Sequence, residues 1–67
     1  SRYEQVLIKA ISGQKLTMHG RHYTPTGMRG WSAVVFRGDG DHRRHVFGID
    51  YLLNHLRDWE RPATRGG

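Results

Sequence analysis

The stretch from Trp31 to Ile49, WSAVVFRGDGDHRRHVFGI, decides the fold that we predict. Its first seven residues are rich in β-branched and aromatic side chains and have a glycine on each side, which is typical of a strand. Asp-Gly supplies the positive φ angles that hairpin turns need, so GDGD at 38–41 predicts a turn. The segment 42–49 then returns as an antiparallel strand.

Alternation divides the return strand into two faces. One face carries Arg43, His45, Phe47 and Ile49, and the other carries Arg44 and Val46. Because one face must be core, we expect the two arginines to diverge and at least one to project from the rim of the sheet. For Trp31 and Phe36, we favour a place in the core over an exposed stacking role.

A helix is predicted over residues 1–13. The apolar side chains recur at helical spacing and form one stripe: Tyr3, Val6, Leu7, Ala10 and Ile11. Ser1 and Glu4 have the spacing of a capping box, and Gly13 suits the left-handed end of the helix. A strand follows, with Leu16 and Met18 on one face.

The segments that flank the central hairpin complete the pattern. Pro25 cannot donate to a ladder, so residues 21–27 predict an edge strand or a strand end, and residues 26–30 a loop. Asp50 is placed as the N-cap of a helix over residues 51–60, which Pro62 ends. Its leucines and Trp59 repeat at helical spacing.

This order of elements predicts an α+β fold. It has an N-terminal helix, three to four short antiparallel strands that form a small curved sheet or barrel, and a C-terminal helix. The 67 residues are enough for one domain, which we place at 1–62, with a flexible C-terminal tail at 63–67.

Composition narrows the class of protein. The net charge is +5, and residues 15–44 hold most of it, with six basic residues against two aspartates. A concentrated positive field attracts polyanions. The chain has no cysteine and no apolar run of membrane-spanning length, so we expect a cytoplasmic protein without a membrane partner.

Several short elements resemble WYL domains. They are, in order, Ala10-Ile11, Arg21-His22-Tyr23-Thr24-Pro25, Gly30-Trp31, and a final strand with Arg43, Arg44, Phe47, Ile49, Asp50 and Leu52. The resemblance runs from about residue 7 to residue 52, although Ser32 and Ala33 stand where the family has the Tyr and Leu of its name. The resemblance implies an Sm-like small barrel that acts as a regulatory module. Such modules either sense nucleic acid, often single strands, or modulate a larger nucleic-acid machine.

The basic residues are the first candidate site. Arginines neutralise phosphates while aromatic faces stack bases, which is how small barrels commonly hold single strands. The candidate residues for binding nucleic acid are Arg21, His22, Tyr23, Arg29, Arg37, Arg43 and Arg44. An acidic protein surface would satisfy the same arginines. The alternative is therefore a regulator of the kind phages and mobile elements encode, which docks on a transcription or defence complex such as RNA polymerase.

The predicted C-terminal helix is the second candidate surface. We favour its packing on the sheet, but it would otherwise present aromatic and arginine side chains to a protein partner. These side chains are Tyr51, His55, Arg57 and Trp59.

Metal binding and catalysis find little support. In an extended strand, the rings of each His-x-x-His pair, at 19–22 and 42–45, would point to opposite faces, so neither pair chelates a metal unless it lies on a turn. DGD at 39–41 lacks the other ligands of a calcium loop. The sequence has no nucleophile elbow and no phosphate loop with its lysine. We therefore predict no enzyme, no metal and no cofactor.

Overall fold

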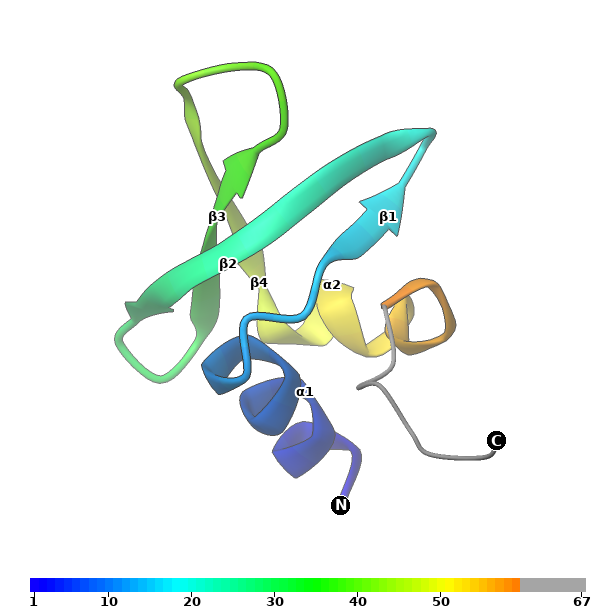
Figure 1. Cartoon of the computed structure of the whole chain (residues 1–67). Coiled ribbons are helices and arrows are strands. Elements are labelled where there is room, and N and C mark those ends of the chain that lie inside the picture. Colours follow the sequence, from blue (N-terminus) through cyan, green and yellow to red (C-terminus); the bar gives the residue numbers. More distant parts are fainter. Residues whose placement is uncertain (60–67) are drawn as a thin grey trace.

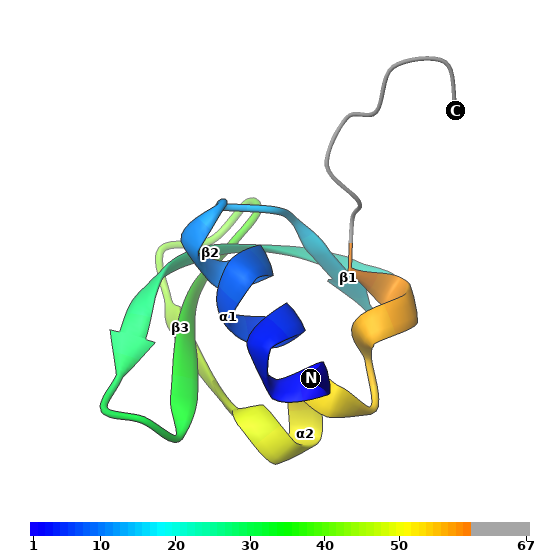
Figure 2. The same cartoon turned by 90° about the horizontal axis from the view of Figure 1, so that it is seen from below.

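The computed structural model describes residues 1–59. Its four strands form one antiparallel sheet in the order β1-β2-β3-β4, which curls into a half-barrel (Figure 1). The elements are α1 (Arg2–Ile11), β1 (Leu16–Met18), β2 (Arg21–Arg29), β3 (Ala33–Gly38), β4 (Arg44–Gly48), α2 (Ile49–Leu53) and the 3₁₀ turn η1 (Leu56–Asp58). Seen from below, α1 and α2 lie against the inside of the curl (Figure 2). The predicted α+β fold is confirmed.

The ends of α1 follow the predicted signals. The Ser1 side chain accepts a hydrogen bond from the backbone N–H of Glu4 at 3.3 Å, and Gly13 takes φ +70° just after the helix. Val6 is fully buried, and it anchors the helix on the sheet. The predicted stripe is too wide, however, because Ile11 is 82% exposed.

The core is formed by the side chains that alternate toward the inner face of the sheet. The inner face of the sheet, α1, α2 and the last described residue enclose one cluster, made up of Val6, Leu16, Met18, Tyr23, Val34, Phe36, Ile49, Leu52 and Trp59. On β4, His45 and Phe47 are half-buried while Arg44 and Val46 are exposed, so the predicted division of this strand into two faces is confirmed.

The prediction of an edge strand or a strand end at Pro25 holds only in part, because β2 has a partner on both sides up to Tyr23 and pairs with β3 alone beyond it. β2 is the longest strand and lies between β1 and β3. The sheet tolerates Pro25 because pairing with β1 reaches only to Tyr23, and because a bulge between Pro25 and Gly27 interrupts the ladder to β3. Residues 26–29, predicted as a loop, continue β2 instead.

The prediction of one helix over residues 51–60 is wrong, because the structure has a short helix followed by a 3₁₀ turn. The helix begins at Ile49 with Gly48 as its N-cap, so Asp50 lies inside the first turn, and it ends at Leu53. The chain then turns through η1 so that Trp59 bridges to Leu16 at the edge of β1. The predicted helix end at Pro62 and the tail at 63–67 lie outside the described residues.

The indole of Trp59 shows why the long helix breaks. Its Nε1–H donates to the backbone carbonyl of Gln14 at 2.7 Å, and its side chain is 2% exposed. A straight helix would carry Trp59 away from β1, so burial of this ring outweighs helical spacing.

Within residues 1–59, no helix is long and apolar enough to cross a membrane.

Candidate functional site

Two turns lie together at one end of the sheet. His19 and Gly20, both with positive φ, join β1 to β2, and residues 39–43 join β3 to β4. Both turns lie at the top of Figure 1, opposite the turn between β2 and β3. We call this part of the molecule the hairpin end.

The hairpin end gathers most of the predicted basic site. The predicted residues found there are Arg21, His22, Arg37, Arg43 and Arg44, and all five are exposed. Within residues 1–59, none of these arginines forms a salt bridge with a carboxylate. Asp39 pairs with Lys15 at 3.3 Å, and Asp41 with His45 at 3.4 Å. The arginines therefore present their charge to solvent.

Arg37 and Arg44 lie directly opposite each other on the outer face of β3 and β4. On the neighbouring strand β2, Thr24 is the partner of Arg37, so one row of polar side chains crosses β2, β3 and β4. Farther along β2, His22 shares a hydrogen bond of 2.8 Å with Thr17. Like charges at directly opposed positions destabilise a sheet, so the Arg37–Arg44 pair carries a cost that an anion would relieve.

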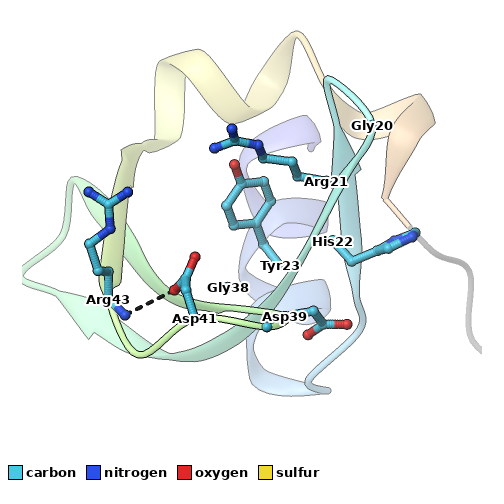
Figure 3. A pocket seen from close by; sticks show the side chains of 9 residues that line it. Gly20, Arg21, His22, Tyr23, Gly38, Asp39, Asp41 and Arg43 are labelled. Atoms are coloured by element: carbon cyan, nitrogen blue, oxygen red, sulfur yellow. Dashed lines mark hydrogen bonds between the residues drawn. The ribbon is translucent and has the colours of Figure 1, made fainter.

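The other two arginines flank a hollow of about 370 Å³. In Figure 3, Arg21 and Arg43 stand on its two sides, with Tyr23 and Asp41 between them. The Tyr23 side chain is only 7% exposed, because its ring packs against His45 and other core rings. Of the two residues that we predicted to help by stacking bases, Tyr23 or His22, Tyr23 is therefore not available, since its ring is covered.

Asp41 shapes the turn that carries Arg43. Its carboxylate accepts a hydrogen bond from the backbone N–H of Arg43 at 2.9 Å. This hydrogen bond, with help from His45, holds the pKa of Asp41 below its ordinary value of 3.8. Gly38 leaves the space that the Asp41 carboxylate and the His45 ring occupy. Asp41, one of the two acidic residues that line the hollow, thus has a structural role in the turn; the other, Asp39, pairs with Lys15.

Exposed rings lie beside the β1–β2 turn. The Tyr51 hydroxyl and His19 Nε2 are 3.5 Å apart, and the rings of Tyr51 and His55 are 4.7 Å apart. His55 is in turn held by Asp58 through a contact of 3.2 Å. Tyr51 is 42% exposed, but its ring also stacks on Phe47, with the two ring centroids 5.7 Å apart. The sequence analysis considered His19 only as half of a His-x-x-His pair, although a His-Gly turn between two strands is a signal that could have placed it at this end of the sheet.

The remaining predicted residues are separated from the hairpin end. Arg29 ends β2 at the opposite end of the sheet, beside the turn that carries Trp31. Trp31 was expected in the core, but it is 85% exposed, because β3 begins only at Ala33. Arg57 is exposed on η1, whereas Trp59 is core and is therefore not available to a protein partner.

The histidine pairs do not form a cluster of ligands. Within the described part of the chain, no group of three or more histidine and carboxylate side chains is arranged to hold a metal ion. His22 instead contacts Thr17 on the outer face, and His45 contacts Asp41 inside.

Comparisons with known proteins add no relative. No family model, no curated protein and no solved structure matches the chain. The resemblance to WYL domains therefore stays a prediction.

Proposed function

We propose that this chain is a small regulatory module that binds nucleic acid through its hairpin end. The observation that carries the proposal is the set of four exposed arginines there, none paired with a carboxylate of residues 1–59. Exposed arginines that are free of acidic partners bind phosphate oxygens well, because the guanidinium donates two parallel hydrogen bonds. In this proposal they contact successive phosphates.

A single strand is the favoured ligand. Its bases are unstacked and can lie on exposed rings, whereas those of a duplex are covered. His19 offers an exposed ring on the β1–β2 turn, next to Arg21 at the start of β2. A flexible strand can also follow the curl of the sheet from the outer arginines to the hollow.

The resemblance to WYL domains extends this proposal to control of transcription or of defence. In that role the module changes the activity of a larger machine and has no catalytic function of its own. The same arginines would serve on an acidic protein surface, such as one on RNA polymerase.

The test uses two arginines of the same strand. Arg21 and Arg29 lie at opposite ends of β2, so Arg29→Ala is a matched control for Arg21→Ala. Fluorescence anisotropy with labelled single-stranded DNA, duplex DNA and RNA measures the affinity. We expect a preference for one single-stranded ligand, weakened by Arg21→Ala and little changed by Arg29→Ala. Equal loss in both variants, or equal weak binding to all three ligands, would leave only general attraction between charges and would favour an acidic protein partner.

A further inference from the structure

All five histidines of the chain lie at the hairpin end or beside it. His19 and His42 lie in the two turns that form this end. His22 is the second residue of β2 and His45 is the second residue of β4. The ring of His55 is 6.1 Å from the ring of His19. The part of the molecule that gathers the exposed arginines thus also gathers every imidazole of the chain.

Carboxylates hold two of these rings. His45 Nε2 lies 3.4 Å from Asp41 Oδ2, and His55 Nδ1 lies 3.2 Å from Asp58 Oδ2. Both histidine side chains are half-buried, with 18% and 20% of their surface exposed. When these two imidazoles gain a proton, the neighbouring carboxylate matches the new charge. They therefore add little to the positive field that a ligand meets at the surface.

The other three rings have hydroxyl partners or none. Within residues 1–59, His19, His22 and His42 are exposed and form no ion-pair contact with a carboxylate. The ring of His22 shares a hydrogen bond with the Thr17 hydroxyl, and His19 contacts the Tyr51 hydroxyl. A hydroxyl donates to a neutral imidazole and accepts from a charged one, so both contacts are compatible with protonation.

The charged neighbours of His22 come from three segments of the chain. Arg21 precedes it on β2, and the backbone N–H of Asp39, in the β3–β4 turn, donates to the His22 carbonyl at 3.0 Å. The Asp39 carboxylate is paired with Lys15, which lies just before β1. A proton gained by His22 is therefore not neutralised by this carboxylate.

The same holds for the two histidines in the turns. His42 lies between Asp41 and Arg43 in the chain, and the Asp41 carboxylate is already held by the Arg43 N–H and by a histidine of β4. His19 faces His55 of the segment that follows α2, and the charge of His55 is matched by its own carboxylate. Protonation of either turn histidine thus adds to the exposed positive charge.

We propose that the hairpin end binds nucleic acid more tightly in mildly acidic solution, because His19, His22 and His42 then become additional contacts for phosphates. This inference rests on the proposed function. Imidazole gains a positive charge as the pH falls through about 6.5. The four arginines give the hairpin end an exposed charge of +4, and three protonated imidazoles raise it to +7. A phosphodiester stays negative throughout this range, so the ligand does not offset the change.

Each new contact has a measurable consequence. For a single strand, one phosphate contact contributes about −0.7 to the slope of log K against log salt concentration. Four arginines predict a slope of about −2.8, and three added imidazoles would steepen it to about −4.9 when all of them contact phosphates. One charge-assisted hydrogen bond is enough to tighten binding about tenfold.

Fluorescence anisotropy with a short labelled strand of thymidines tests the proposal, at about pH 5.5 and about pH 7.5 and at several salt concentrations. Thymine does not change charge in this range, so only the protein titrates. In the test variant, His19, His22 and His42 are replaced by asparagine, which does not titrate and which tolerates the positive φ of His19. His55→Asn is the matched control, because Asp58 already matches the charge of this ring. Circular dichroism confirms that both variants fold at both pH values.

The wild type and His55→Asn should bind at least about tenfold more tightly at the lower pH, with a steeper salt slope, whereas the triple variant should show neither change. Equal affinity and equal slope of the wild type at both pH values would overturn this inference and leave the proposed function in place. A triple variant that keeps the full pH dependence would do the same. A wild type that binds the strand at neither pH would instead overturn the proposed function, and this inference with it.

Discussion

Replacing Arg44 by threonine should stabilise the fold and weaken binding at the same time. Arg44 lies directly opposite Arg37 in the ladder, and opposed like charges cost about 0.2–1 kcal/mol. Threonine is well suited to an exposed strand position, so Arg44→Thr should recover that amount. For a domain of this size, the midpoint of thermal unfolding should then rise by about 1–8 °C.

The same substitution removes one phosphate contact from the proposed site. For single strands, each contact contributes about −0.7 to the slope of log K against log salt concentration, so the slope should become shallower by about 0.7. Thermal unfolding followed by circular dichroism and anisotropy at several salt concentrations measure the two effects on one preparation.

Val46→Thr separates charge from strand propensity. Val46 is exposed on the same face of β4, two positions away. The Val46→Thr variant introduces the same threonine side chain without a change of charge, so we expect no change in the slope of log K against log salt concentration. A variant Arg44→Thr that is less stable than the wild type and binds as tightly would refute the reasoning.

Three further predictions concern the core and the β3–β4 turn. Trp59→Phe should destabilise the fold by about 2–4 kcal/mol in urea unfolding, because it leaves the Gln14 carbonyl unpaired and a gap in the core; a change near zero would argue against the bridge to β1. Gly38→Ala should cost about 1 kcal/mol, since its Cβ would lie 2.7 Å from the Asp41 carboxylate and would push it off the Arg43 N–H; the wild-type midpoint would contradict this crowding. The lowered pKa of Asp41 stabilises the fold above pH 3.8, and this contribution is lost as the pH falls through the folded-state value. The wild type should therefore be more stable than Asp41→Asn at pH 6, and this difference in the free energy of unfolding should disappear in acid. A difference that is constant with pH would exclude a contribution from the Asp41 pKa.

Local chemistry was enough to predict much of the fold. Alternation placed Leu16 and Met18 inside, and Asp-Gly marked the β3–β4 turn, because both signals depend on neighbouring residues alone. The path after Leu53 was not predictable in this way. Helical spacing is equally satisfied by a continuous helix, and the bridge between Trp59 and Leu16 joins residues far apart in the chain.

The candidate site was predictable in composition but not in arrangement. The excess of arginine between residues 15 and 44 is visible in the sequence. Only the pairing of the strands shows that Arg37 meets Arg44, and that Arg29 lies at the other end of the sheet. Trp31 was misplaced because its type favours burial, while the start of β3 at Ala33 leaves it in an exposed turn.

The central claim is that four arginines of the hairpin end contact phosphates. The most direct measurement is the salt dependence of binding to a short single strand, for the wild type and for a variant with all four replaced by alanine. Four contacts at about −0.7 each predict a wild-type slope of about −2.8, and a slope near zero for the variant. A wild-type slope that persists in the variant would contradict the claim, because the phosphates would then be bound elsewhere on the chain.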